Sequence, residues 1–436
     1  MIRDLTIENF KSYRQATLPL APLTLLIGAN ASGKSNLIEA IRFFSWMAQG
    51  RRLDDIMEKL QQEGIVIRGT LESLLFDMAQ SGTLVLGCTL TNTDEWEHLR
   101  IEMLLEDERD MRILAESVRS SSSAVPLYEI KPPGDPFKHE ISVAYNNFAR
   151  GGRKPTVPCS DRQAIFTQLD IPSRFNEGLA RETIPDIAAK FQQTLRDILF
   201  LDPNPHGMGL YSSIVDNSLR GDGSNLSSVL YDLCEEKKQK EQVLLFIRAL
   251  PEQDIADIRF LKTPRNEVMV QLVESFAGKK KNRDALVLSD GTLRVLAISA
   301  ALLSAPEGSL VIIEEIDNGV HPSRAGILLH NIQETAEARK LRVLLTSHNP
   351  ALLDTLPTEA IPNVVACYRD PQRGDSCLVR LEDMSDYAEL VAYGPLGQLM
   401  TRGVLDRFLK NQRLSEEKKA EAQDWLASFQ AQLEKV

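Results

Sequence analysis

The sequence has little of what would anchor it in a membrane, bind zinc or form disulfides. None of its apolar runs approaches the roughly 20 residues that a membrane-spanning helix needs. The first ten residues, MIRDLTIENF, carry charges where a secretory signal would need an apolar core. The five cysteines are scattered without a CxxC pair, which argues against a zinc site and fits a reducing compartment. We therefore expect a cytoplasmic protein with no membrane partner.

Positive charge is also in short supply. The 436 residues contain 50 lysines and arginines against 61 aspartates and glutamates, which gives a formal net charge of −11. Bulk attraction to nucleic acid is therefore not expected, and a contact with DNA would need a local basic patch. One candidate is GKKKNR at residues 278–283, for which a solvated loop is the favoured interpretation.

Long heptad stretches and internal repeats are missing as well. Prolines recur between residues 126 and 251 and would interrupt a long coiled coil. The composition, with 43% hydrophobic and 25% charged residues, is that of a globular chain. Residues 95–285 mix loop-like stretches with two helical ones, IPDIAAKFQQTLRDILF and NLSSVLYDLCEEKKQKEQVLLFIRAL, so this region has no clear fold signature.

Clear patterns lie at the two ends of the chain. Near the start, IRDLTIENF alternates like a half-buried strand, LTLLIG reads as a buried parallel strand, and a helical pattern follows. Near the end, buried strands are predicted in GSLVIIEEID, LRVLLTSHNP and NVVACYRD, with helices between them. This alternation predicts a parallel α/β sheet, in which ligands bind at the carboxyl ends of the strands.

The stretch GANASGKSN links the first buried strand to the first helix and matches GxxxxGK[ST] at every fixed position. Its glycines let the backbone wrap closely, so that N–H groups point at phosphate oxygens. We expect Lys34 to reach the β- and γ-phosphates of ATP and the Ser35 hydroxyl to ligate Mg²⁺. An ordinary glycine-rich turn is the alternative, which the fitting flanks disfavour. The predicted nucleotide-binding residues here are Gly28, Ala29, Asn30, Ala31, Ser32, Gly33, Lys34, Ser35 and Asn36.

Polar side chains end the later strands. Most P-loop proteins have aspartate where this chain has Glu314, so we expect Glu314 to hold Mg²⁺, with the extra methylene favouring contact through water. Glu315 is predicted to polarise the attacking water. Two solvated carboxylates are the alternative. His348, at the next strand end, and Ser289 and Gly291, at a helix start that would bind an anion, are less specific alone.

Together these motifs resemble those of the ABC-type ATPases of the RecF/SMC and OLD-like group. In chain order they are ENFKSY, GANASGKSN, LSDGT, VIIEEID, NGVHP and TSH, and they cover residues 1–48 and 286–355. The wording EEIDNGVHPSR and SHNP is most similar to small prokaryotic ATPases of anti-phage and mobile-element contexts. The resemblance implies an α/β fold, an ABC-type P-loop sheet flanked by helices, with a mixed α+β insertion. The expected parts are a P-loop half at 1–95, a partner-docking insertion at 96–285 and a half with C-terminal helices at 286–436.

The resemblance also implies a homodimer, or a larger homo-oligomer, that sandwiches two ATP molecules with Mg²⁺. The P-loop of one chain would face Ser289 and Gly291 of the other, while His348 would sense the γ-phosphate and join Lys34 and Glu315 as catalytic. The residues implied near the dimer seam are Asp317, Asn318 and His321.

Two departures from the pattern stand out. In LSDGT, Asp290 replaces the usual second glycine and Thr292 the usual glutamine, and an acid so near the phosphates would slow closure around ATP. The glutamine that these families place near the metal has four candidates, Gln49, Gln61, Gln62 and Gln80.

The rest of the sequence favours an ATPase that acts on a partner. There is no hinge or long heptad region for an SMC protein, and RLEDMSD at residues 380–386 is a loop more readily than a nuclease site. We expect control of a separately encoded effector, a nuclease or toxin, in anti-phage defence. A RecF-like repair ATPase that clamps DNA is the alternative, and the RecF-type start disfavours a transporter ATPase.

Overall fold

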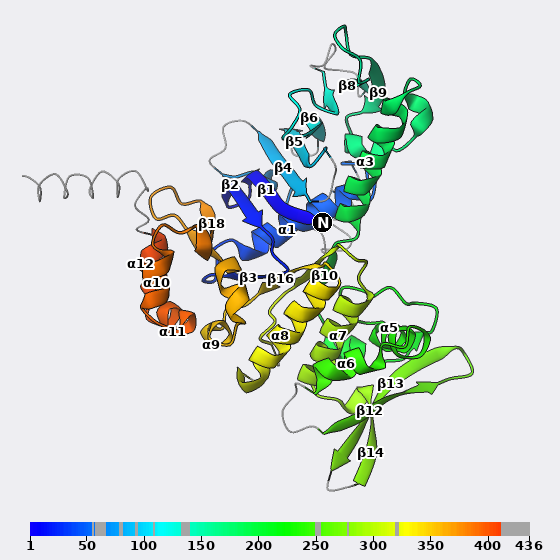
Figure 1. Ribbon diagram of the computed structural model, residues 1–436, viewed down its shortest axis with the longest axis vertical. Coiled ribbons are helices and arrows are strands. Elements are labelled where there is room, and N and C mark those ends of the chain that lie inside the picture. The colour runs from blue at the N-terminus through cyan, green and yellow to red at the C-terminus, as the bar shows by residue number, and fades with distance from the viewer. Residues whose placement is uncertain are drawn as a thin grey trace, which may run out of the picture.

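The computed structural model describes residues 1–54, 56, 67–77, 82–91, 95–107, 110–131, 140–248, 254–276, 279–318 and 322–410. Within these residues the chain forms three sheets, with two hydrophobic cores (Figure 1). A parallel sheet lies in the middle of the molecule, an antiparallel sheet lies on one side of it, and a smaller ribbon projects from the opposite end.

The central sheet gathers short strands from distant parts of the chain. Its order is β10-β15-β16-β3-β17-β18, in which neighbours are parallel except for β17 and β18. This confirms the predicted α/β fold with a P-loop sheet, and SCLVRLED supplies its last strand. The strands are β3 Leu23–Ile27, β10 Leu199–Leu201, β15 Leu310–Ile313, β16 Arg342–Thr346, β17 Val365–Arg369 and β18 Ser376–Arg380.

The two faces of this sheet belong to different cores, because successive side chains of a strand point to opposite sides. Leu26 and Leu344 pack into one core, whereas Leu25 and Leu345 pack into the other. Helices therefore cover both faces, as the sequence predicted. They are α1 Lys34–Ala48 on the first face, and α7 Asp290–Ser304 and α8 Pro322–Ala338 on the second.

The second sheet is antiparallel and follows the chain order closely, β2-β1-β4-β5-β6-β7-β8-β9. Helix α3, Leu179–Arg196, packs beside α1 and shares the core of this sheet. The expected division of the chain at residues 95 and 96 stays a prediction, and it falls between two paired strands. The strands are β1 Ile2–Phe10, β2 Tyr13–Pro19, β4 Thr83–Leu90, β5 His98–Asp107, β6 Asp110–Arg119, β7 Tyr128–Ile130, β8 Glu140–Tyr145 and β9 Thr156–Ser160.

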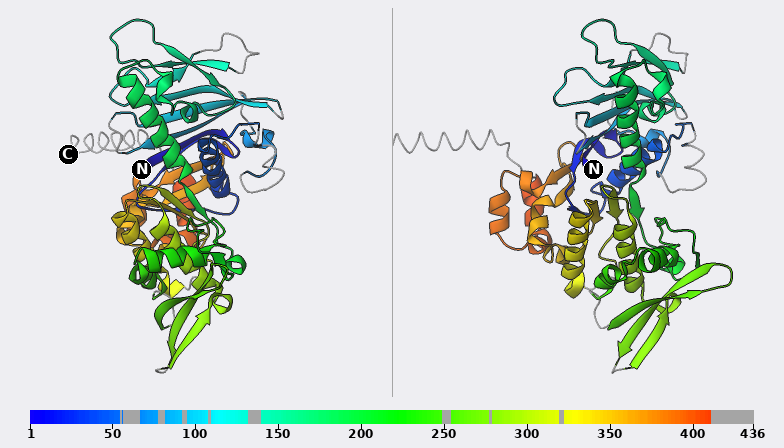
Figure 2. Two further views of the ribbon diagram at one scale, coloured as in Figure 1. Left: turned by 90° about the vertical axis from the view of Figure 1, so that its right-hand side faces the viewer. Right: turned by 45° about the vertical axis from the view of Figure 1, so that its right-hand side comes forward.

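The third sheet forms the projecting ribbon, which the turned views also show (Figure 2). The expected loop at residues 278–283 is wrong in its described part, because Lys279–Asp284 forms the edge strand β14 paired with β13. Backbone pairing holds this polar stretch, and lysines are common on exposed edge strands. The other strands of this sheet are β11 Ser212–Ser213, β12 Ile255–Lys262 and β13 Glu267–Phe276, and the helices that contact it are α5 Leu226–Tyr231 and α6 Lys240–Ile247.

Short helices complete the fold. The stretch RLEDMSD contains a single 3₁₀ turn, Leu381–Asp383, whose Asp383 pairs with Arg380 at 2.8 Å. Among the described residues, no helix combines the length and the apolar character that crossing a bilayer requires. The remaining helices are α4 Pro205–Met208, α9 Pro350–Leu353, α10 Tyr387–Ala392, α11 Leu396–Thr401 and α12 Val404–Lys410.

Candidate active site

The loop between β3 and α1 packs closely against the β17–β18 hairpin at its two glycines. Gly28 and Gly33 have φ angles of 155° and 122°, and a Cβ atom at either position would collide with the β17–β18 hairpin. At Gly28 the collision would be with the carbonyl oxygen of Cys367, and at Gly33 with the side chain of Ser376. Glycine is therefore required here by the protein's own packing as well as by any phosphate.

A polar wall supports the back of this loop. The hydroxyl of Tyr13 donates a hydrogen bond to the carbonyl of Gly33 at 3.1 Å, and the hydroxyl of Ser376 donates to the carbonyl of Ser32 at 2.6 Å. Asn36 extends the wall by donating to the hydroxyl of Ser12 at 2.8 Å. The first two bonds hold the carbonyl of Gly33 towards β2 and the carbonyl of Ser32 towards the hairpin. Sequence reasoning missed this support, although Ser12 and Tyr13 lie in the ENFKSY motif.

Lys34 lies across the loop. Its ammonium group donates to the carbonyl oxygens of Gly28 and Ala29 at 2.5 and 3.0 Å. Burial lowers the pKa of Lys34 from its ordinary value, while nearby Glu315 acts in the opposite direction. Ala29, Asn30 and Ala31 are exposed on the outer side of the loop. The loop thus holds a lysine near the position where phosphates would bind.

A cavity of about 680 Å³ opens beside this loop and joins Ser35 to Glu314. Glu314 follows β15, and its N–H donates to the carbonyl of Leu201 on the neighbouring strand β10 at 3.2 Å. Its carboxylate oxygen Oε1 lies 2.8 Å from the guanidinium of Arg42, a residue of α1. This ion pair could not be predicted from the sequence, because the two residues are 272 positions apart.

Glu315 has an unusual backbone conformation and three polar partners. Its φ angle is 50°, the left-handed region that non-glycine residues rarely adopt and that often marks functional sites. The N–H of Glu315 donates to the hydroxyl of Thr346 at 2.9 Å. One carboxylate oxygen accepts from Asn318 at 2.5 Å, and the other lies 3.5 Å from Nε2 of His348. The structure therefore brings together two of the three predicted catalytic side chains, Glu315 and His348.

An aspartate lies opposite Glu314, just past the end of strand β10. Asp202 directly follows β10 and lines the same cavity as Ser35 and Glu314. Of the four glutamine candidates, Gln49 caps the far end of α1, about 20 Å along the helix from Ser35. The other three, Gln61, Gln62 and Gln80, lie outside the described residues. The signal for Asp202 was its place directly after the apolar stretch ILFL, in a region that showed no motif.

Ser289 and Gly291, which belong to the LSDGT signature motif, make no polar contact with the P-loop within the described part of the chain. Ser289 caps helix α7 by accepting a hydrogen bond from the N–H of Thr292 at 3.2 Å. No hydrogen bond or ion pair among the described residues joins Ser289 or Gly291 to the P-loop. Of the predicted seam residues, Asp317 is partly buried and Asn318 contacts Glu315, while His321 lies outside the described part of the chain.

Oxygen donors around the cavity fit a hard divalent cation. The hydroxyl of Ser35 and the carboxylates of Glu314 and Asp202 all line it, and Mg²⁺ prefers oxygen ligands. Next to Gly33, the hydroxyl of Ser32 is buried without a hydrogen-bond partner in the described structure. Mg²⁺, when bound with a nucleotide, would neutralise phosphate charge, and Ser35 and Glu314 are the residues we expect to hold it.

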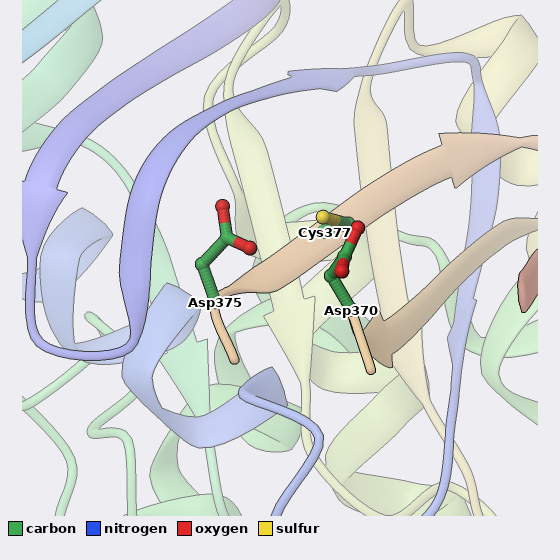
Figure 3. A group of neighbouring side chains, drawn as sticks. All are labelled: Asp370, Asp375 and Cys377. Atoms are coloured by element: carbon green, nitrogen blue, oxygen red, sulfur yellow. The ribbon is translucent and has the colours of Figure 1, made fainter. Parts of the chain in front are cut away.

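A second group of possible metal ligands lies on the β17–β18 hairpin (Figure 3). Ligand atoms of Asp370, Asp375 and Cys377 lie within 4.8 Å of one another. The guanidinium of Arg373 lies 3.2 Å from Asp370, 3.5 Å from Asp375 and 3.6 Å from the sulfur of Cys377. Burial raises the pKa of the Cys377 thiol, which opposes the thiolate form that metals need. Arg373 already supplies the positive charge of this cluster, so we assign it no metal.

Two protein-family models match the regions that build the site. One, described as "AAA ATPase domain", matches residues 1–103. The other, described as "AAA domain, putative AbiEii toxin, Type IV TA system", matches residues 163–354. The first therefore contains the P-loop, and the second contains Glu314, Glu315 and His348.

Individual relatives fall into short, similar matches and long, distant ones. The DNA replication and repair protein RecF of Brucella abortus is 40% identical over 85 residues, which are 19% of this chain and only 22% of RecF. The retron Vc95 probable ATPase of Vibrio cholerae is 19% identical over 386 residues, covering 83% of this chain and 72% of the relative. An ATP/GTP phosphatase of Helicobacter pylori is 19% identical over 82% of this chain and 87% of its own.

Among solved structures, an SMC head bound to the C-terminal winged-helix domain of ScpA aligns with 87% of this chain and 96% of its own. Its sequence identity is 15% and its TM-score 0.44, too loose a likeness for comparing residues. The family matches, the long relatives and the motifs themselves agree on one conclusion. The chain resembles ABC-like ATPases of the P-loop type, with similarity to the retron ATPase over most of its length and to RecF over a short segment.

Proposed function

We propose that the chain binds and hydrolyses ATP, dimerises around it and thereby controls a separately encoded effector, a nuclease or toxin, in anti-phage defence. One observation carries the enzymatic part of this proposal. Lys34, Ser35, Glu314, Glu315 and His348 come from three separate stretches of sequence, and all follow the carboxyl ends of β3, β15 and β16. Ligands of parallel α/β sheets bind at such ends.

Each of these side chains has a role that its surroundings allow. Lys34 would exchange its loop carbonyl partners for phosphate oxygens and neutralise charge that develops during phosphoryl transfer. The carboxylate of Glu315, held by Asn318, would accept the proton of the attacking water. His348, 3.5 Å from Glu315, would report on the γ-phosphate and help to orient that carboxylate.

The position of the LSDGT motif at the start of helix α7 supports dimerisation. Ser289 begins α7, a helix of 15 residues whose first N–H groups make a suitable anion site. Ser289 and Gly291 have no bond to the P-loop of their own chain among the described residues. We therefore expect the Ser289 and Gly291 of a second chain to contact the phosphates. Two such contacts, related by symmetry, would enclose two ATP molecules.

The defence role is supported by the names of two matches. The retron ATPase of Vibrio cholerae aligns over 83% of this chain, and one matching family model carries a toxin–antitoxin description. We place the effector on a separate chain because Glu382 and Asp383, the acids of RLEDMSD, both pair with Arg380. A cytoplasmic location follows from this role.

The test uses the purified chain with ATP, with Mg²⁺ or Mn²⁺, and with supercoiled, linear and single-stranded DNA. We expect ATP hydrolysis and ATP-dependent association in gel filtration, without DNA cleavage. Co-expression with the product of the neighbouring reading frame should then produce a nucleotide-dependent complex. Cleavage by the chain alone that survives Glu315→Gln but is lost on replacing Glu382, Asp383 and Asp386 would contradict the separate effector.

A RecF-like role in DNA repair is the second candidate. The 40% identity to RecF supports it, although the match covers 22% of RecF. Strand β14 also presents three exposed lysines, Lys279, Lys280 and Lys281, for which no ion pair occurs in the described structure. If this role is correct, replacing all three by alanine should weaken duplex binding and reduce its salt dependence. Equal DNA binding by the wild type and the triple alanine variant would show that strand β14 does not contact DNA.

A further inference from the structure

The ion pair between Arg42 and Glu314 is held from both sides. Arg42 lies on α1 about two turns after Ser35, so both side chains reach the same cavity. Its guanidinium carbon lies 4.6 Å from the centre of the Phe200 ring, a cation–π contact, while its Nη2 lies 2.8 Å from Oε1 of Glu314. The two side chains are 21% and 26% exposed, so solvent screens the pair only in part.

The other basic side chains around the cavity pair with acids other than Glu314. Glu39 contacts Lys11 and Arg68, and Arg68 Nε lies 2.5 Å from it. Arg220, which also lines the cavity, pairs with Asp216 at 2.6 Å. The positive charges of Lys11, Arg68 and Arg220 are thus directed to other acids. Arg42 is the cation that the structure assigns to Glu314.

The length of the glutamate side chain matters for this contact. An aspartate at position 314 would withdraw the carboxylate by one methylene, about 1.5 Å. The observed distance of 2.8 Å to Arg42 would then exceed hydrogen-bonding range without a shift of the backbone. The departure from the usual aspartate therefore has a structural consequence, because it lets the carboxylate reach α1.

We propose that Arg42 is a positioning residue that holds Glu314 in a preformed ion pair, so that a divalent cation binds here tightly only together with nucleotide. The guanidinium and a divalent cation compete for the same carboxylate and repel each other. Nucleotide phosphates would compensate that repulsion. This inference rests on the proposed function of the site as one for Mg²⁺ and ATP.

Mn²⁺ binding in the absence of nucleotide tests the inference, with electron paramagnetic resonance of free Mn²⁺ as the measurement. Wild-type protein should bind Mn²⁺ weakly, and Arg42→Gln should bind it about 10- to 100-fold more tightly, because a neighbouring positive charge is gone. Arg42→Lys keeps the charge and should stay near wild type. Arg42→Gln combined with Glu314→Gln should lose the gain.

Two further variants make the experiment decisive. Arg181→Gln is the matched control, since Arg181 is also a helical arginine with a glutamate partner, Glu177 at 3.8 Å, and should change nothing. Glu314→Gln alone should bind Mn²⁺ no more tightly than the wild type, because the charge of Arg42 remains while a carboxylate is lost. Arg42→Met removes the same charge and replaces Arg42→Gln in the test if Arg42→Gln fails to fold.

The inference is overturned if Arg42→Gln binds Mn²⁺ no more tightly than wild type. It is also overturned if the gain persists without Glu314, or if Glu314→Gln alone binds Mn²⁺ more tightly than the wild type. Adding a non-hydrolysable ATP analogue should raise the affinity of wild-type protein for Mn²⁺ towards that of Arg42→Gln. If no variant binds nucleotide at all, the proposed function fails, while the measurement without nucleotide still decides the role of Arg42.

Discussion

The two large sheets differ in the length of their strands and in how far apart in the sequence their paired strands lie. The parallel sheet has strands of three to five residues, and hydrogen bonds join segments as far apart as β3 and β17. The antiparallel sheet pairs strands mainly in chain order, and its longest strands have ten residues. All the candidate catalytic side chains follow strands of the parallel sheet.

This difference suggests a division of labour. A parallel sheet brings the carboxyl ends of distant segments to one edge, which is what a multi-residue site needs. An antiparallel sheet built from neighbouring segments can change its loops and length without disturbing that edge. We therefore expect substitutions at the ends of the parallel strands to affect chemistry more than stability, and buried substitutions in the antiparallel sheet to do the reverse.

Lys34→Ala should have the largest effect, a nearly complete loss of ATP binding or turnover. It removes the ammonium from the phosphate site and also two hydrogen bonds to the loop carbonyls. The melting temperature should change little, because the loop lies at the edge of the sheet. Steady-state hydrolysis and a fluorescent-nucleotide titration measure the effect. Normal hydrolysis by a preparation free of other ATPases would contradict the P-loop assignment.

Glu315→Gln should reduce ATP turnover by about 10²–10⁴-fold while ATP binding persists, because an amide cannot take the proton of the attacking water. Glu314→Gln should instead weaken the dependence of binding on Mg²⁺. Single-turnover kinetics over a range of Mg²⁺ concentrations separates the two effects. The same mild defect in both variants would show that neither carboxylate has its assigned role.

Ser289→Arg should abolish ATP-dependent association and leave ATP binding by the monomer largely intact. The new side chain would place bulk at the start of α7, where phosphates of a partner chain are expected. Light scattering in a Glu315→Gln background, which preserves bound ATP, is the appropriate measurement. Equal association with and without the substitution would argue against the sandwich.

Glu116→Gln tests the other half of the comparison and should affect stability rather than catalysis. Glu116, buried in the antiparallel sheet, accepts hydrogen bonds at 2.7 Å from the hydroxyl of Tyr128 and from the N–H groups of Ile165 and Phe166. Burial raises the pKa of Glu116 from 4.5 to about 7. Between these values the folded state binds more protons than the unfolded state, so the free energy of unfolding falls as pH rises.

That loss should be roughly 2–3 kcal/mol between pH 4.5 and 7.5 in the wild type. Glu116→Gln cannot ionise and should lack this part of the pH dependence. Urea unfolding across this pH range measures it, with Glu129→Gln as the control, because Glu129 lies on the same sheet but is 45% exposed. Identical slopes for wild type and Glu116→Gln would contradict the shifted pKa.

Much of the parallel sheet could be predicted because its signals are local. A buried strand, a glycine-spaced loop and a pair of carboxylates each occupy a few consecutive residues. Arg42, Asp202, Tyr13 and Ser376 could not be predicted, because their roles arise from contacts with segments far away in the chain. Strand β14 was misread because it has no apolar residue to mark its pairing.

The wall behind the P-loop has a consequence for synthesis. Ser376 supports the carbonyl of Ser32 across 344 positions of sequence. At translation rates of roughly 5–20 residues per second, the P-loop waits about 20–70 s on the ribosome before this support is made. A nascent chain that stops short of the β17–β18 hairpin would carry the whole phosphate motif with Tyr13 and Ser12 but without the support of Ser376. Nucleotide capture would therefore report that nearly all of the ATPase sheet has been synthesised.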